Sequence, residues 1–146
     1  MRPILMITLC GLLGLSATNC NPSPKPIAYG TDTCYFCRMT IVDRQHASEF
    51  VTDKGKVYRF DAIECMVNSM KEIGEDNLAI YLCTTFDRPG VLVDATTATF
   101  LISKALSSPM GANITAFSNK TEAGKALDEY GGEQYDWPQL LSYLYQ

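Results

Sequence analysis

The spacing of hydrophobic residues predicts a hairpin followed by a helix in the middle of the chain. Hydrophobic positions on both sides of the turn "TDKGK" predict a β-hairpin over residues 48–61. Four hydrophobic residues follow with helical spacing: Ile63, Met66, Val67 and Met70. Asp61 and Glu64 form a capping-box pattern at the start of this helix, and Gly74 ends it. We expect Met66 and Met70 to lie in the core.

The rest of the chain predicts more strands and helices, and therefore an α+β fold. Strands are expected at residues 77–86, 90–96 and 113–118, and helices at 121–130 and after Asp136. The segment 97–106 fits either a short helix or an extended strand. "YRFDAIECMVNSM" and "EQYDWPQLLSYLY" form a weak internal echo, in which an aromatic residue and an aspartate precede a helix. The echo predicts two small strand-and-helix units, with Met39 and Met110 opening corresponding halves.

The N-terminal residues have the pattern of a secretory signal. Arg2 precedes an apolar stretch at residues 4–15, and Cys20 closes the segment as in the lipobox of bacterial lipoproteins. We therefore predict a signal peptide at 1–19 and a lipidated, proline-rich, extended tether at 20–30. The folded domain is expected at 31–146. An ordinary signal peptide with an incidental cysteine is the alternative.

Composition and charge narrow the function. Hydrophobic residues make up 47% of the chain and charged residues 19%, which is typical of a globular protein. The net charge is −4 and there is no basic run, which argues against binding to nucleic acid. Beyond the predicted leader and Cys20, four cysteines remain: Cys34, Cys37, Cys65 and Cys83. Outside the cytoplasm these thiols could pair as disulfides.

Several candidate metal ligands lie within thirteen residues: Cys34, Cys37, Met39 and His46. Thiolate and thioether sulfur are the donors that Cu(I) prefers. In an extended segment, Cys37 and Met39 would point the same way and suit the low coordination number of Cu(I). Met110, in a glycine-containing turn, could supply a further sulfur. His46 fits a ligand and a surface residue equally well.

Other roles for these residues remain open. Met39 could pack in the core, Cys83 fits a buried strand position, and Cys65 could go either way. A thioredoxin-like site needs a helix after the second cysteine, whereas "MTIVD" is strand-like. A four-cysteine zinc site normally repeats the Cys-x-x-Cys knuckle, and the second knuckle is missing. One histidine nine residues from Cys37 is a poor basis for a hydrolase.

Four stretches together resemble the NosL family, the accessory lipoproteins of nitrous oxide reductase: "CYFCRM", "EFVTDKGKVYRFDAIECM", "SSPMGANITAF" and "DEYGG". The resemblance runs from about Thr31 to Tyr143. It implies two similar ββαβ units, at about 31–85 and 86–146. It also implies a membrane-anchored Cu(I) chaperone on the periplasmic side, which delivers copper to nitrous oxide reductase together with an ABC-type membrane complex. Such a protein transfers its metal and is not an enzyme.

The resemblance also implies a ligand set. By position, the copper donors would be Cys37 and Met39 of the Cys-x-Met motif and Met110 of Pro-Met-Gly, with Cys34 as a further ligand or disulfide partner. Arg38 stands where the family usually has glycine. Two other hypotheses remain: a thiol–disulfide oxidoreductase that uses Cys34 and Cys37, and a binding module with structural disulfides.

Overall fold

The computed structural model describes residues 21–146. The predicted signal peptide and the predicted lipidation site, Cys20, lie outside the described residues. In the described part of the chain, no helix is both long enough and apolar enough to cross a membrane.

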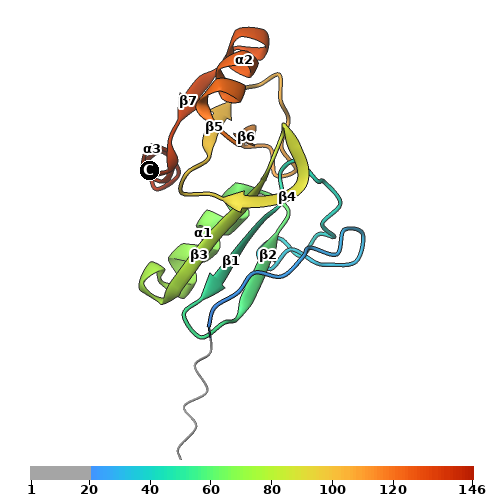
Figure 1. The fold of residues 1–146 in the computed structure, drawn as a ribbon, viewed down its shortest axis with the longest axis vertical. Coiled ribbons are helices and arrows are strands. Elements are labelled where there is room, and N and C mark those ends of the chain that lie inside the picture. Colours follow the sequence, from blue (N-terminus) through green and yellow to red (C-terminus); the bar gives the residue numbers. More distant parts are fainter. Residues whose placement is uncertain (1–20) are drawn as a thin grey trace, which may run out of the picture.

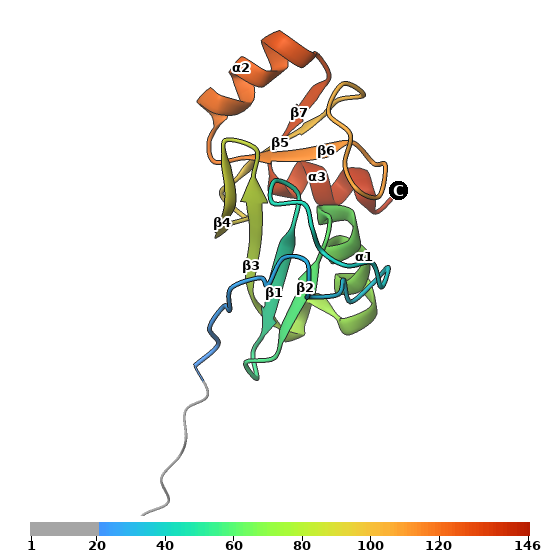
Figure 2. The ribbon, with the colours of Figure 1, turned by 90° about the vertical axis from the view of Figure 1, so that its right-hand side faces the viewer.

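The first half of the described chain forms a four-stranded antiparallel sheet. Its elements are β1 (Ser48–Thr52), β2 (Val57–Phe60), α1 (Ile63–Ile73), a 3₁₀ turn (Glu75–Asn77), β3 (Leu78–Thr85) and β4 (Arg88–Asp94). The strand order is β2-β1-β3-β4, so the hairpin predicted from the sequence is confirmed. Helix α1 covers one face of the sheet, while the N-terminal segment crosses the other face (Figures 1 and 2).

The second half forms a smaller sheet of three antiparallel strands. Its elements are β5 (Thr99–Ile102), β6 (Ile114–Phe117), α2 (Lys120–Tyr130), β7 (Glu133–Tyr135) and α3 (Trp137–Leu144). The strand order is β6-β5-β7. The segment 97–106, for which helix and strand were both possible, therefore contains a strand. Strand β7 has no counterpart in the predicted elements.

The two halves repeat the same topology. In β1-β2-α1-β3 and in β5-β6-α2-β7, the first strand is central and pairs antiparallel with the other two. The sequence echo matched different elements, because it aligned β2-α1 with β7-α3. Met39 precedes β1 whereas Met110 lies between β5 and β6, so they do not occupy corresponding places. Strand β4 pairs with β3 and adds a fourth strand to the first sheet, after the β1-β2-α1-β3 unit ends at Thr85.

A single core joins the two units. Helix α3 lies between the sheets and contacts both α1 and β5 (Figure 2). Residues from both halves belong to one buried cluster, among them Phe50, Phe60, Met66, Met70, Phe100, Ile114, Trp137 and Leu140. The prediction that Met66 and Met70 are core residues is therefore confirmed. Burial of one face of each sheet against a shared layer is what fixes the two units together.

The N-terminal segment joins the fold earlier than predicted. The backbone N–H of Lys25 donates to Oε1 of Glu49 at 3.0 Å, and Ile27 is buried. Glu49 is itself fully buried on β1, so this contact attaches the segment to the outer face of the first sheet. The proline-rich stretch is therefore free only up to about Pro24, and folded structure begins near Lys25 rather than Thr31.

The ends of the helices agree with the sequence except at one point. Asn119 caps α2, and Asp136 forms a capping box with Gln139 at α3, where Pro138 sits in the first turn. Helix α1 instead begins after Ala62 without a side-chain cap, although Gly74 ends it as predicted. The carboxylates of the predicted capping box are used elsewhere, as described below.

Candidate metal centre

A tight loop brings the two cysteines of the Cys-x-x-Cys motif together. The N–H of Cys34 donates to the carbonyl of Met39 at 2.8 Å, and the N–H of Arg38 donates to the carbonyl of Cys34 at 3.0 Å. Arg38 has φ of +68°, so the segment is a turn and not the extended strand that the sequence suggested. Only an isolated bridge, between Thr33 and Thr40, follows the strand-like pattern of this region.

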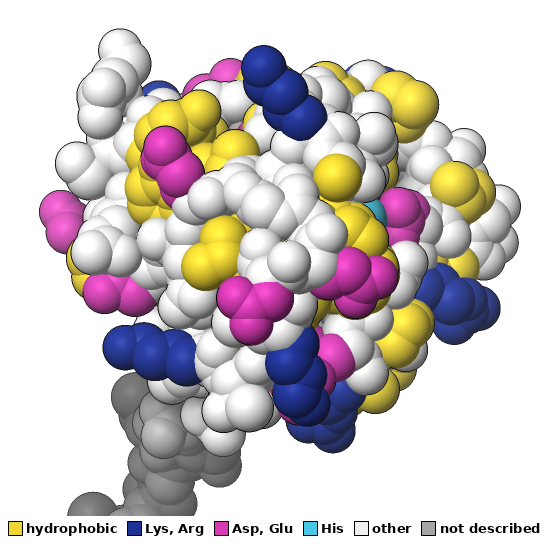
Figure 3. Space-filling view, turned by 90° about the horizontal axis from the view of Figure 1, so that it is seen from above, with side chains coloured by type: hydrophobic (Ala, Val, Ile, Leu, Met, Phe, Trp, Pro, Cys, Tyr) yellow, Lys and Arg dark blue, Asp and Glu magenta, His cyan; other side chains and the backbone are white. Residues whose placement is uncertain are grey.

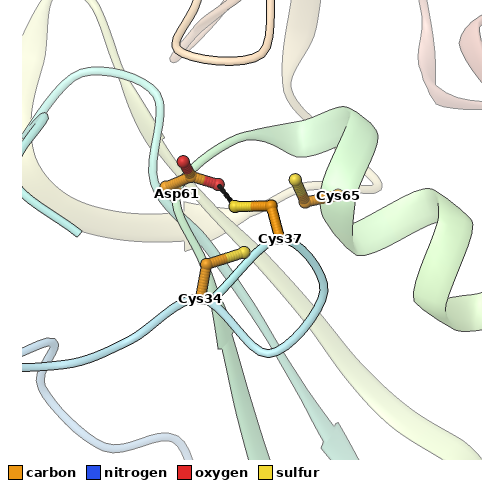
Figure 4. Close-up of side chains that lie close together, drawn as sticks. All are labelled: Cys34, Cys37, Asp61 and Cys65. Carbon is orange, nitrogen blue, oxygen red and sulfur yellow. Dashed lines mark hydrogen bonds between the residues drawn. The ribbon is translucent and has the colours of Figure 1, made fainter. Parts of the chain in front are cut away.

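Four side chains converge where this loop meets α1. The side-chain ligand atoms of Cys34, Cys37, Asp61 and Cys65 all lie within 4.8 Å of one another. The Cys37 thiol donates to Oδ1 of Asp61 at 3.4 Å. Figure 4 shows the Cys37 sulfur directed to Asp61, with Cys34 from the same loop and Cys65 from the start of α1 beside them. We call this group the cysteine cluster.

Burial and hydrogen bonding make the three thiols unequal. Cys34 and Cys65 are buried, whereas Cys37 is partly exposed. Hydrogen bonding to the Cys65 thiol lowers the pKa of Cys34 to about 6, and the same contact together with burial raises the pKa of Cys65. Burial raises the pKa of Cys37 to about 11. The lowered pKa favours the thiolate form of Cys34, whereas the raised pKa values favour the protonated thiols of Cys37 and Cys65.

The donor set suits a soft metal ion. Three thiol sulfurs match the two or three ligands that Cu(I) accepts, and three sulfurs with one carboxylate would also form a tetrahedral Zn²⁺ site. All four described cysteines are free thiols, so the cluster is in the state that binds metal. A thioredoxin-like reaction fits less well. Cys34 is inaccessible, and Cys37 does not stand at the start of a helix, because the next helix, α1, begins only at Ile63.

The two methionines predicted as ligands lie at the surface. Met39 is 53% exposed and Met110 is 40% exposed, so neither is a core residue. The loop that carries Met110 is attached to α1, because Oε1 of Glu64 accepts from Oγ of Ser108 at 2.8 Å and from the N–H of Ala112 at 3.3 Å. Glu64 precedes Cys65, so this contact holds the Met110 loop beside the helix end that carries the cluster.

His46 lies outside the cysteine cluster. Its Nδ1 is 2.8 Å from Oδ2 of Asp43, and its Nε2 is 3.2 Å from Oγ1 of Thr115. Since Thr115 belongs to β6 and His46 precedes β1, this buried side chain links the two units. Nε2 makes that link, and Nδ1 is engaged by Asp43 of the same loop.

Two cluster residues, Asp61 and Cys65, were not predicted as ligands. Asp61 follows β2 and resembled a helix cap, but its carboxylate accepts from Cys37 instead. Cys65 is four residues further on, and this i, i+4 spacing near a helix start was the available signal in the sequence. Cys83 packs in the core within β3, as expected.

Comparisons with known proteins identify the family of this chain and a solved structure with a similar fold. The family model described as NosL matches residues 28–143. A search of curated proteins gives no match. The crystal structure of the copper chaperone NosL from Shewanella denitrificans aligns with a TM-score of 0.71 and 20% sequence identity, over 82% of this chain and 96% of that chain. At this level of identity, the likeness shows that the two proteins share a fold.

Proposed function

Because this chain belongs to the NosL family, we propose that it is a metallochaperone that carries Cu(I) on its cysteine cluster to maturing nitrous oxide reductase. The observation that carries the proposal is the convergence of three free thiols, from the loop and from α1, within 4.8 Å. Soft sulfur donors in this number hold Cu(I) without enclosing it. In this proposal copper is the cargo, and no substrate bond is made or broken.

Cys34, Cys37 and Cys65 would hold the ion in different ways. Cys34 and Cys65 lie inside the protein and provide donors that do not exchange with solvent. Cys37 is the accessible thiol, so an incoming ligand would replace it first. The exposed thioethers of Met39 and Met110 are further soft donors at the surface, where an ion could be passed to or from the cluster.

The proposed location is outside the cytoplasm, at the periplasmic side of a membrane. The apolar N-terminal stretch and Cys20 support a lipid anchor. The attachment of the chain to the first sheet from Lys25 onward would hold the folded part close to that anchor. The proposed partners are nitrous oxide reductase and its ABC-type maturation complex, as the NosL resemblance implies.

Anaerobic Cu(I) titration of residues 21–146 against a chromophoric chelator tests the proposal. We expect one Cu(I) per chain. Cys37→Ser and Cys65→Ser should each weaken binding by more than the about 10- to 100-fold that loss of an outer-shell partner costs, because each removes a donor. Met39→Ala and Met110→Ala should weaken it less, by about tenfold at most. Cys83→Ala is the matched control, because it removes a thiol outside the cluster. Failure of the wild-type protein to retain Cu(I) against a weak chelator would overturn the proposal.

A further inference from the structure

A small groove lies on the outer side of the loop that holds the cysteine cluster. Its volume is about 220 Å³, and it lies between this loop and β2. The N–H of Tyr35 donates to the carbonyl of Arg59 at 2.9 Å, which fixes the loop to the strand. The rings of Tyr35 and Tyr58 pack edge to face, with centroids 4.7 Å apart, and form the aromatic lining.

The groove carries positive charge that the described residues do not neutralise. The guanidinium of Arg38 lies 5.0 Å from the centroid of the Tyr35 ring, and the ammonium of Lys56 lies 4.5 Å from that of the Tyr58 ring. Within residues 21–146 neither cation has a carboxylate partner. Arg59 differs, because its Nε lies 3.4 Å from carboxylate oxygens of both Asp32 and Glu49.

This concentration of charge is unusual for the chain as a whole, which has a net charge of −4. On the face shown in Figure 3, charged side chains of both signs alternate with separate hydrophobic spots, so that face does not favour one sign of charge. The groove does, because two free cations stand above aromatic rings. Side-chain carboxylates are the groups that such a site attracts.

The groove and the cysteine cluster share one loop. Arg38 follows Cys37 in the chain, so the cationic lining and the accessible thiol belong to the same turn. Phe36 and Met39, on the same loop, are 38% and 53% exposed. A partner held by the groove would therefore contact the same loop that carries Cys37, the accessible thiol of the cluster.

We propose that this groove docks an acidic segment of the copper-accepting protein, and that Arg38 and Lys56 hold its carboxylates while its own sulfur ligand attacks the ion. The inference rests on the proposed copper function. A concave site of this size fits one or two side chains of a protein segment, whereas a lipid surface is flat. Charge complementarity at such a site speeds association and selects the partner.

The transfer step is a ligand exchange without a change of oxidation state. A bond forms between Cu(I) and the acceptor's sulfur, and the bond between Cu(I) and the Cys37 sulfur breaks. The released Cys37 thiolate takes a proton from water. Repetition of this exchange at the buried sulfurs moves the ion to the acceptor.

Stopped-flow transfer from the copper-loaded protein to two synthetic peptides tests the inference. Both peptides carry the same Cys-x-x-Cys site, flanked in one by aspartates and in the other by lysines. We expect transfer to the acidic peptide to be about tenfold faster at low salt, with the difference disappearing as NaCl is raised. Lys56→Gln should slow transfer to the acidic peptide about threefold or more, and should not slow transfer to the lysine peptide, whose repulsion it relieves. Lys54→Gln is the matched control, because it removes an exposed lysine of the same hairpin that does not line the groove.

Two results would overturn the inference. One is equal slowing of transfer by Lys56→Gln and Lys54→Gln. It would mean that the transfer rate depends on the net charge of the protein and not on the groove. The other is unchanged peptide transfer in Lys56→Gln together with weaker binding to phosphatidylglycerol vesicles, which would assign the groove to a membrane. Failure of the copper proposal is distinguished from both, because the wild-type protein would then not retain Cu(I) in the titration that precedes the transfer experiment.

Discussion

Replacing Asp61 with asparagine separates a copper site from a zinc site in the cysteine cluster. Asp61 is buried and its Oδ1 accepts from the Cys37 thiol at 3.4 Å. In a Cu(I) site the three thiolates already supply every donor, so the carboxylate only adds negative charge. In a tetrahedral Zn²⁺ site the same carboxylate would be the fourth ligand. The substitution therefore changes affinity for the two ions in opposite directions.

The size of the effect follows from the distances in the cluster. Coulomb's law with an effective dielectric constant of about 20 gives about 3.5 kcal/mol for two unit charges at the 4.8 Å that bounds the group. Cys37 is partly exposed, so solvent reduces this repulsion to about 1–3 kcal/mol. Asp61→Asn should therefore tighten Cu(I) binding by about 10- to 100-fold. It should weaken Zn²⁺ binding by a similar factor or more, because loss of even an outer-shell partner of a metal site costs about 10- to 100-fold.

Competition titrations with a Cu(I) chelator and a Zn²⁺ chelator, run in parallel, measure both changes. Asp53→Asn is the matched control, because it removes the same charge from the β1–β2 turn at the other end of the hairpin. Far-UV circular dichroism of each variant checks that α1 still forms. A tenfold loss of Cu(I) affinity in Asp61→Asn would refute the reasoning and make the carboxylate part of the copper site.

Three further predictions concern stability and pH. Gly132→Ala should lower the free energy of unfolding, measured in urea, by about 2–4 kcal/mol. Its φ is +113°, and the new Cβ would lie 2.3 Å from a carbonyl oxygen of β5. Gly131→Ala should lower it by only about 1–2 kcal/mol, because its φ is +63° and its Cβ would meet open space. Arg38→Gly should raise stability by up to about 1 kcal/mol in the same assay, because glycine adopts the left-handed φ freely. Cu(I) affinity should rise about 100-fold per pH unit between pH 7 and 9, because two thiols with raised pKa values, Cys37 and Cys65, must release protons on binding.

Each of these has a result that contradicts it. Equal losses of stability in Gly132→Ala and Gly131→Ala would mean that the close approach to β5 is not what the alanine disturbs. A loss of stability in Arg38→Gly would show that the contact of Arg38 with Tyr35 stabilises the fold by more than the left-handed backbone conformation of Arg38 costs. A flat pH profile, after correction for the chelator, would show that the cluster thiols are not the copper donors.

Local patterns were enough to predict most of the strands and helices, and they failed where a distant contact decides. The hairpin at β1 and β2, helix α2 and the capped start of α3 follow from spacing, turns and caps within a few residues. Strand β7 was missed because "EQY" is short and polar, and it forms a strand only by pairing with β5. Strand β4 lies in the segment predicted as the second half, although it pairs with β3 of the first sheet.

The cluster was half predictable for the same reason. The spacing of Cys34 and Cys37 identifies them as a candidate pair in the sequence. Asp61 and Cys65 join them only because the loop closes against α1. The capping-box reading of Asp61 and Glu64 was reasonable locally. It was wrong because Asp61 accepts from Cys37 and Glu64 holds the Met110 loop, and both contacts span more than twenty residues.

The repeated topology places all of the thiol chemistry in one of two matching units. The first unit has the cysteines, and no cysteine follows Cys83 in the chain, although the second unit has the same strand order. A lone ββαβ unit would leave one layer of apolar side chains facing water, and the second unit covers it. One unit is thus constrained by the cysteine cluster, and the other by packing and by the loop that carries Met110. Sequence in the second unit is therefore free to vary wherever β6, α3 and the Met110 loop keep their contacts, so the two halves can look unrelated in sequence and still share one architecture.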